Sequence, residues 1–335
     1  MNYLIIRNDG VGDLILSTPL INKIKDSDIN AKIYLICSDR NHNIAKLYKK
    51  NNYIFDYILF DQNKSKLRNI LNILKLLRNN YFDTIFTLKA SNFNYFLSLI
   101  LHSKYKKYIV HKNKSKNGNI RFTPPLLLIK KKKYELIDCT NEYKDSAGIH
   151  MSDHFLNLYI QSNKYTSEKY YIPEIKNETK LSDRINLSFI NKRFVIFHVD
   201  EKWNNIKNSK FIIIEIIRYF KSQLNINLLI TSGLNKYIEL KYIKKESNNV
   251  DNITYVDDVD IESLLYLASK ASLVVTCHGA LTHISAYFKT PLIDLIDENR
   301  KYFFLKWRPR IRLSKQIDYY NIKKILETIN DYLRL

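Results

Sequence analysis

The chain of 335 residues carries 54 Lys and Arg against 33 Asp and Glu, a formal net charge of +21, and 45% of its residues are hydrophobic. That apolar content excludes wholesale disorder, and the length suits two domains of ~100 to 200 residues each. No uncharged apolar run approaches the ~20 residues of a membrane span. Three distant cysteines, Cys37, Cys139 and Cys277, indicate neither a disulfide framework nor a cysteine-rich zinc site.

The positive charge allows several interpretations. Most of the excess is lysine scattered among Asn, Ile and Tyr, as an AT-rich genome would encode, although a nucleic-acid-binding surface would also be basic. Denser clusters at Lys104, Lys106 and Lys107 and at residues 130–133 would attract an anionic membrane surface or a phosphorylated acceptor, or simply be solvated. A strand-like run begins at Tyr3 and leaves no room for a signal peptide, so we expect a cytoplasmic protein with at most peripheral contact to the inner face of the membrane.

The first half of the chain alternates β-branched or aromatic runs with helix-period segments, which indicates a parallel sheet with right-handed crossovers. The expected helices lie between the strands, most clearly from Lys66 to Leu77, and one more runs from about Ser152 to Ser162. Residues 112–150 are polar, basic and broken by glycine and proline, which predicts a long loop region. The expected strands are Tyr3 to Arg7, Lys32 to Cys37, Tyr57 to Phe60 and Thr84 to Leu88.

The alternation stops in a linker-like stretch, Asn163 to Asn191, and then resumes. We therefore expect a first domain at 1–165, a linker at 166–192, a second domain at 193–315 and a final helix at 316–335 that packs back on the first domain. Helices are expected at Ile261 to Lys270 and near Leu281. The expected strands of the second domain are Phe194 to His198, Asn227 to Thr231, Ile253 to Val256, Leu273 to Thr276 and Leu292 to Leu295.

The first segment with chemical potential is the turn after the first strand. Gly10 and Gly12 give the backbone freedom, and the turn places free N–H groups and the Asp13 carboxylate at the carboxyl end of the strand, where open α/β sheets bind ligands. Asn8 belongs to the same loop. The third glycine of a dinucleotide fingerprint and the lysine of a P-loop are missing. Asp13 would alternatively serve as a helix cap.

The second segment follows the first strand of the second domain. Asp200, Glu201 and Lys202 stand at the strand's carboxyl end, where Lys202 would hold a diphosphate as a point charge. The alternative is a solvated loop anchored by Trp203.

The third segment is a strand, a small-residue turn and a helix start that offers unpaired N–H groups and a helix dipole to an anion. The spacing of His278 and His283, without a carboxylate beside them in the sequence, argues against a metal site. His283 would alternatively be a buried histidine with satisfied hydrogen bonds. The candidate ligand-binding residues here are His278, Gly279, Ala280, Thr282 and His283.

Together these segments resemble the bacterial heptosyltransferase family, glycosyltransferase family nine. The N-terminal run is similar to that family's strand, basic residue, loop ending in Gly-Asp and helix with Thr-Pro, here Thr18-Pro19. The third segment is similar to its small-residue loop, His, Ala-bearing helix and Lys-Pro, here Thr290-Pro291. Trp307 and Pro309 also match the family's order.

The resemblance implies an α/β GT-B fold with two facing Rossmann-like domains and parallel sheets. It implies inverting, metal-independent transfer of a heptose or related sugar from a nucleotide-diphosphate donor to a lipopolysaccharide-type or other surface-glycan acceptor, with ADP-heptose as the first donor to test and no further cofactor. Asp13 matches the family's general base, Lys202 its phosphate-binding lysine and His283 its donor-site histidine.

The sequence also departs from that family. Where the family usually has Asp-Thr-Gly, this chain has His278-Gly279-Ala280, so the carboxylate that contacts the donor sugar is missing, and Asp200 or Glu201 would have to replace it. A Rossmann-type NAD-dependent oxidoreductase is the alternative enzyme, and a basic nucleic-acid-binding module is the alternative without catalysis. The incomplete dinucleotide fingerprint and the two glycine turns weigh against these.

Overall fold

The computed structural model describes residues 1–114, 119–125, 133–139, 149–160, 187–223, 225–233, 237–248 and 250–335. The chain divides into two compact units, one of Met1–Glu174 with Leu305–Trp307 and one of Ile175–Phe304 with Arg308–Leu335. The division falls among residues 161–186, which lie outside the described residues. The expected domain limits and linker therefore stay predictions.

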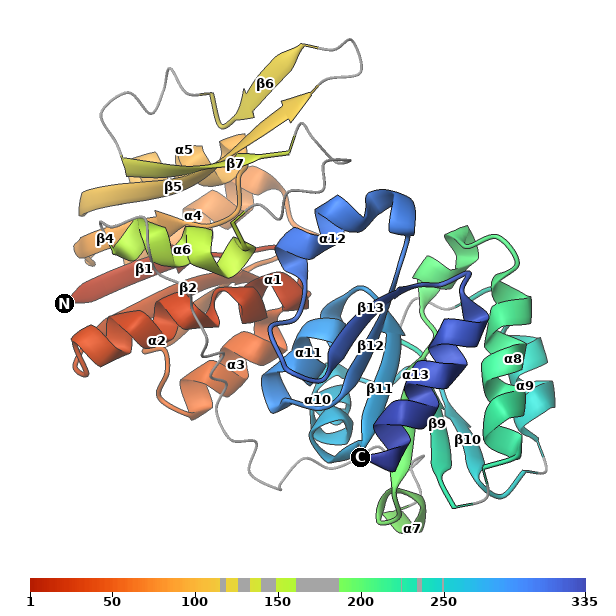
Figure 1. The fold of residues 1–335 in the computed structure, drawn as a ribbon. Helices are drawn as coiled ribbons and strands as arrows, with labels where there is room; N and C mark the ends of the chain where they lie inside the picture. Colours follow the sequence, from red (N-terminus) through yellow and green to blue (C-terminus); the bar gives the residue numbers. More distant parts are fainter. Residues whose placement is uncertain are drawn as a thin grey trace. The chain divides into compact units, whose positions relative to one another are not determined.

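The first unit is built on a sheet whose central strand is β1 (Figure 1). Its strands run in the order β3-β2-β1-β4-β5-β6, with β7 also paired to β5. All these pairs are parallel except β5 with β6. The elements in chain order are β1 (Asn2–Ile6), α1 (Val11–Leu16), α2 (Thr18–Ser27), β2 (Lys32–Ser38), α3 (His42–Lys50), β3 (Asp56–Phe60), α4 (Lys66–Leu77), β4 (Phe82–Thr87), α5 (Asn92–Ile100), β5 (Ser103–Lys114), β6 (Ile120–Thr123), β7 (Lys133–Asp138) and α6 (Met151–Tyr159).

The expected loop over residues 112–150 is wrong for the part that the structure describes. Strand β5 continues to Lys114, β6 returns antiparallel to it, and β7 adds a parallel strand at its side. The sequence pattern does not show these strands because their exposed positions mix cations such as Lys104 and Arg121 with apolar side chains such as Ile120 and Leu136, which removes a clear alternation. Residues 115–118, 126–132 and 140–148 of the expected loop lie outside the described residues.

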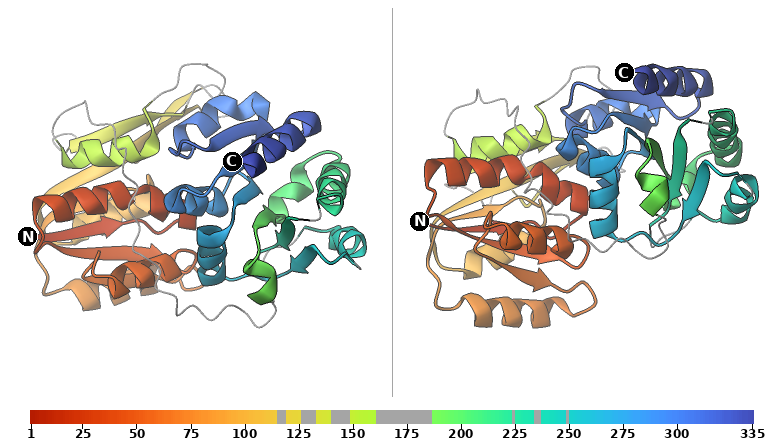
Figure 2. Two further views of the ribbon diagram at one scale, coloured as in Figure 1. Left: turned by 60° about the horizontal axis from the view of Figure 1, so that its bottom comes forward. Right: turned by 90° about the horizontal axis from the view of Figure 1, so that it is seen from below.

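Helices cover both faces of the first sheet (Figures 1 and 2). Helices α2 and α6 contact each other on one face. Helices α4 and α5 pack on the other, where Ile73 and Leu77 of α4 and Leu97 of α5 join the strand residues Leu4 and Ile85 in one apolar cluster. These helices cover the faces of the sheet. The polar carboxyl ends of its strands therefore remain available to a ligand.

The second unit contains a six-stranded, wholly parallel sheet in the order β10-β9-β8-β11-β12-β13, the strand order of a dinucleotide-binding fold. Its elements are α7 (Leu187–Ile190), β8 (Phe194–His198), η2 (Glu201–Asn205), α8 (Ser209–Lys221), β9 (Asn227–Thr231), α9 (Leu240–Ser247), β10 (Ile253–Val256), α10 (Ile261–Lys270), β11 (Leu273–Cys277), α11 (Ala280–Phe288), β12 (Leu292–Ile296), η3 (Glu298–Arg300), the first part of α12 (Lys301–Trp307), β13 (Ser314–Asp318) and α13 (Ile322–Arg334).

The expectation for the C-terminus is wrong in two respects. Residues 314–318 form strand β13 at the edge of the second sheet, not the start of the last helix. The last helix, α13, then buries Ile325 and Ile329 in the core of the second unit, against α8, β11 and β12. It is part of the second unit. Among the described helices, none has the length and apolarity to cross a bilayer.

Candidate functional site

The predicted residues collect at the carboxyl ends of two pairs of neighbouring strands, one pair in each sheet. In the first sheet β1 and β4 are neighbours, and residues 7–13 follow β1. In the second sheet β8 and β11 are neighbours, with residues 199–202 after β8 and 278–280 after β11. Each pair is the point where the strand order reverses, which is where such sheets bind ligands.

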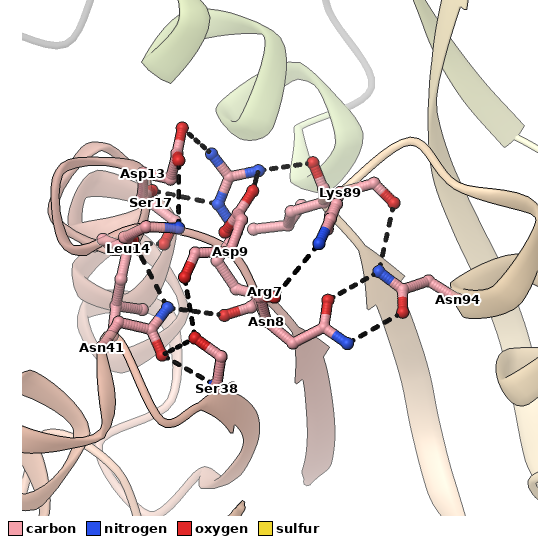
Figure 3. A network of polar contacts seen from close by, with 12 residues as sticks. Arg7, Asn8, Asp9, Asp13, Leu14, Ser17, Ser38, Asn41, Lys89 and Asn94 are labelled. Atoms are coloured by element: carbon pink, nitrogen blue, oxygen red, sulfur yellow. Dashed lines mark hydrogen bonds and ion pairs between the residues drawn. The ribbon is translucent and has the colours of Figure 1, made fainter. Parts of the chain in front are cut away.

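A buried arginine organises the site of the first unit (Figure 3). Arg7 Nη2 lies 3.1 Å from Asp13 Oδ1, and Nη1 lies 3.2 Å from Asp9 Oδ2. Arg7 also donates to the carbonyls of Asp13 (3.0 Å) and Leu88 (2.7 Å), and its guanidinium stacks over Phe155 at 4.8 Å. The guanidinium thus fixes two carboxylates and the loop after β4 in one arrangement.

Asp13 makes the helix-cap contact that the sequence left open, and its role as a general base stays a prediction. Its Oδ2 accepts a hydrogen bond from the Gly10 N–H at 3.2 Å, so it caps the start of α1. A Cβ on residue 10 would lie 3.0 Å from that same oxygen, so glycine gives the carboxylate its place. About a third of the Asp13 side chain stays exposed, at 30%, and it can therefore meet an incoming hydroxyl.

The other loop residues of the prediction have structural contacts. Asn8 is buried and exchanges two hydrogen bonds with Asn94 at the start of α5, at 2.8 and 3.0 Å (Figure 3). Lys89 donates to the Asn8 carbonyl at 3.2 Å. Gly12 is buried inside α1. These residues hold the β1 loop against the β4 loop, which positions Asp13.

Asp9 is the residue of this site that sequence reasoning missed. Its Oδ1 is buried and has no hydrogen-bond partner among the described residues. Burial raises the pKa of Asp9 to about 6, although the Arg7 guanidinium opposes the shift, and the Asp13 charge raises it further. Its spacing from Arg7 and Asp13 was visible in the sequence, but its burial was not.

Asp9→Asn should change the pH dependence of stability. Because folding raises this pKa from 3.8 to about 6, the carboxyl contributes stability that is complete below pH 3.8 and is lost as the pH rises through 6. The Asn variant cannot ionise, so it should gain roughly 1–3 kcal/mol relative to the parent between pH 4 and 7. Urea unfolding across this range measures the difference.

Asp61→Asn is the matched control for that experiment. The pKa of Asp61 is lowered from 3.8 by a hydrogen bond from the Asn63 backbone and by Lys64, so the relative stability of its variant should fall only as the pH rises toward 3.8 and should stay constant between pH 4 and 7. The same trend in both variants would contradict a buried, proton-holding Asp9.

In the second unit Lys202 lies over the turn at Gly279. Lys202 Nζ pairs with Asp200 Oδ2 at 2.5 Å, and Asp200 also accepts the Lys202 backbone N–H at 3.2 Å. A Cβ on residue 279 would collide with this ammonium and lie 3.2 Å from Lys202 Cε. Burial disfavours the ammonium charge, but the Asp200 carboxylate outweighs it, so the pKa of Lys202 lies above its ordinary value. A permanent cation is therefore held at the start of α11.

A histidine held by a buried carboxylate follows the neighbouring strand β11. His278 Nδ1 lies 2.8 Å from Asp294 Oδ2, and Asp294 is fully buried on the neighbouring strand β12. Asp294 also accepts from Gln316 at 2.9 Å and from Thr282 at 3.1 Å, while the Thr282 hydroxyl accepts the Gly279 N–H at 3.1 Å. The buried carboxylate fixes the orientation of the imidazole.

The remaining predicted residues of the second unit differ in their surroundings. His283 is buried, with its ring 5.4 Å from that of His278, which agrees with the alternative of a buried, satisfied histidine. Ala280 opens α11, and Glu201 is exposed. Asp200 is committed to Lys202, so it is not placed as a free acidic contact. The structure identifies Asp294 as the carboxylate of this site, behind His278.

The alternative interpretation of the second segment, a loop anchored by Trp203, is also partly correct. Trp203 is fully buried, donates to the His198 carbonyl at 3.3 Å and contacts Phe197 edge to face. Burial lowers the pKa of His198 to about 4, so this histidine stays neutral. The anchored tryptophan gives the loop that carries Lys202 a rigid base. The described residues contain no group of three or more His, Cys, Asp or Glu side chains arranged to bind a metal ion.

Comparison with known proteins places the fold. Neither a family model nor a curated protein matches the sequence. A family 9 glycosyl transferase from Veillonella parvula DSM 2008 has a TM-score of 0.70 at 12% identity, over 98% of this chain and 89% of its own. The E. coli heptosyltransferase WaaC, solved with ADP-2-deoxy-2-fluoro heptose, has a TM-score of 0.66 at 12% identity, over 100% and 99%.

A third similar structure has a different activity. The UDP-GlcNAc 2-epimerase from Methanocaldococcus jannaschii has a TM-score of 0.57 at 14% identity, over 98% of this chain and 92% of its own. The predicted α/β GT-B fold, with two Rossmann-like units, is confirmed. Identities this low show the fold alone, and one fold hosts several reactions, so the reaction depends on the residues of the site.

Proposed function

We propose that this chain is an inverting, metal-independent glycosyltransferase of the heptosyltransferase type. It moves a heptose or related sugar from a nucleotide-diphosphate donor to a lipopolysaccharide-type or other surface-glycan acceptor. The second unit binds the donor, and the first unit contributes the base. The protein works in the cytoplasm at the inner face of the membrane and needs no cofactor besides the sugar nucleotide.

The observation that carries this proposal is the anion site at the carboxyl ends of β8 and β11. The Lys202 ammonium lies against Gly279, the first N–H groups of α11 follow, and the His278–Asp294 pair stands beside them. A diphosphate that leaves the sugar gains negative charge in the transition state. Fixed positive groups at that position stabilise it, and they supply the electrostatic part of catalysis that other enzymes obtain from a metal ion.

Asp13 supplies the acid–base part. It accepts the proton of the acceptor hydroxyl as that oxygen attacks the anomeric carbon, and the carbon–oxygen bond to the diphosphate breaks on the opposite face of the sugar, which inverts the anomeric configuration. Arg7 holds the carboxylate in position through Nη2. The proton is thus transferred to Asp13, and the electron pair of the broken carbon–oxygen bond leaves with the diphosphate.

The donor is a nucleotide sugar, with ADP-heptose the first to test. WaaC was solved with an ADP-heptose analogue, and the epimerase from M. jannaschii was solved in complex with UDP-GlcNAc and UDP. This chain has His278 where heptosyltransferases usually have an acidic residue. The sugar hydroxyls of the donor would therefore meet an imidazole, with Asp294 behind it, and this supports a donor whose sugar is contacted differently from that of ADP-heptose.

A thermal-shift screen tests the proposal. Purified protein is heated with ADP-, GDP-, UDP- and CMP-sugars and with NAD. A ligand at 100 times its Kd stabilises a protein by ~2.7 kcal/mol, which is roughly 5–10 °C for a unit of this size. We expect one nucleotide-sugar class to respond and NAD not to. The product of the responding sugar is then identified by NMR with a glycan acceptor, because epimerisation without acceptor would replace our proposal with an isomerase.

A further inference from the structure

Helices α4 and α5 expose large apolar side chains on one face of the first unit. Leu67 and Leu71 of α4 are 66% and 59% exposed, and Phe96 and Leu99 of α5 are 52% and 37% exposed. Both helices pack on the same face of the sheet, through one apolar cluster, and Figure 1 shows them behind it, opposite α2 and α6. Single exposed leucines are ordinary, but four large apolar side chains on two helices that share one face call for a partner.

The same part of the chain holds most of the excess positive charge. Between Asp61 and Glu135 there are 17 Lys and Arg and one acidic residue, Asp83. Helix α4 and its ends contribute five of these cations, all exposed: Lys64, Lys66, Arg68, Lys75 and Arg78. Lys106 donates to the Leu99 carbonyl and so adds a cation at the end of α5. The charge is therefore concentrated and not scattered.

The lysines that the sequence grouped together are divided by the strand that carries them. Lys106 reaches α5, whereas Lys107 lies over the rings of Phe86 and Tyr159 on the side of α6. Successive side chains of a strand point to opposite faces, so these two lysines cannot serve one surface. Residues 130–132 of the other cluster lie outside the described residues.

We propose that the α4–α5 face, formed by Leu67, Leu71, Phe96 and Leu99 with the cations around α4, is the surface by which the protein lies on an anionic lipid bilayer. Cations attract the protein to acidic headgroups, and leucine and phenylalanine side chains enter the acyl boundary. Nucleic acid would satisfy the cations but leave the leucines without an apolar partner. The proposal extends the membrane location in the proposed function and needs no particular donor or acceptor.

Vesicle co-sedimentation tests this surface without any transfer assay. The probe is phosphatidylcholine vesicles with and without phosphatidylglycerol. Wild-type protein should bind the anionic vesicles and leave them as salt shortens the Debye length to ~8 Å and below. One variant, Lys64→Gln/Lys66→Gln/Arg68→Gln, removes charge, and another, Leu67→Gln/Leu71→Gln/Phe96→Gln, removes apolar surface. Each should lower the partition coefficient by roughly tenfold or more.

Matched controls come from the second unit. Lys241→Gln/Lys244→Gln/Lys245→Gln removes three cations from α9, and Phe211→Gln/Ile238→Gln removes two exposed apolar side chains. Both should bind vesicles like wild type. Unchanged thermal unfolding shows that each variant is folded. Because transfer is not measured, failure of the proposed enzyme activity leaves this result intact.

A reporter variant localises the contact. Leu71→Trp should shift its fluorescence to shorter wavelength on anionic vesicles, and Ile238→Trp should not. The proposal is overturned if wild type binds no vesicles, if the controls weaken binding as much as the α4–α5 variants, or if the apolar variant binds like wild type. Loss of duplex DNA binding in the charge variant, with no vesicle binding by wild type, would assign the surface to nucleic acid instead.

Discussion

Asp13→Asn should lower kcat for sugar transfer by roughly 100- to 10,000-fold, the usual contribution of a general base, and leave the donor Kd nearly unchanged. The amide oxygen can still accept the Gly10 N–H and cap α1, so the geometry of the loop is kept. It cannot take the proton of the acceptor hydroxyl. Because the base acts on the acceptor, its loss appears in the transition state and not in donor binding. Steady-state transfer kinetics and calorimetric titration of the donor measure the two effects.

A helix cap elsewhere provides the control for Asp13. Asp260 caps α10 through the Ser263 N–H at 2.8 Å, so Asp260→Asn makes the same chemical change at a cap in the second unit. It should leave transfer unaffected. Transfer by Asp13→Asn within about threefold of wild type would reduce Asp13 to a helix cap, because a general base contributes far more than that.

Lys202→Ala should weaken both the intact donor and the free nucleoside diphosphate by roughly 10- to 100-fold, the value of one hydrogen bond to a charged group. Both ligands share the diphosphate, which is the group that the ammonium contacts in our proposal. Gly279→Ala should give part of the same loss, because its methyl group would displace the ammonium. Isothermal titration of donor and nucleoside diphosphate against each variant measures this.

Two further variants separate the loss of the Lys202 ammonium from the effect of the Asp200 carboxylate that it leaves unpaired. Removing the lysine leaves the Asp200 carboxylate unpaired, and that charge would itself repel a diphosphate. The double variant Asp200→Asn/Lys202→Ala removes the repulsion and should still bind weakly. Lys207→Ala, at an exposed lysine, should bind normally. If Lys202→Ala binds both ligands as wild type does, the phosphate-binding role passes to another residue, and Lys207 is the first to test.

The central strands of both sheets could be predicted because they are apolar and β-branched on both faces, as a parallel sheet covered by helices requires. Strands β1, β8 and β11 are buried over nearly their whole length, and the sequence shows them clearly. Strand β13 buries only Ile317 fully, because it lies at a sheet edge. The residue pattern of β13 is no different from that of a helix start, and for that reason these residues were expected to belong to the last helix.

The candidate site was predictable where its residues follow one another in the chain, as in the turn from Arg7 to Asp13 and the helix start at Gly279. It was not predictable where partners come from different strands. Asp294 lies 16 residues beyond His278 and meets it because β11 and β12 pair in parallel. Asp9 is visible in the sequence, but its burial and its closeness to the Asp13 carboxylate, which raise its pKa, follow only from the fold.

Helix α4 shows most directly what packing decides. Its sequence determined a helix, since apolar residues recur along it at 67, 70, 71, 74 and 77, and that stripe would be expected to face the core. The structure packs Ile70, Leu74 and Leu77 of this stripe against the core together with Ile73, and it leaves Leu67 and Leu71 in solvent. The helix carries leucine or isoleucine around most of its circumference, so periodicity alone cannot choose the buried face. The sheet and α5 make that choice by supplying the surface against which Ile73 and Leu77 pack.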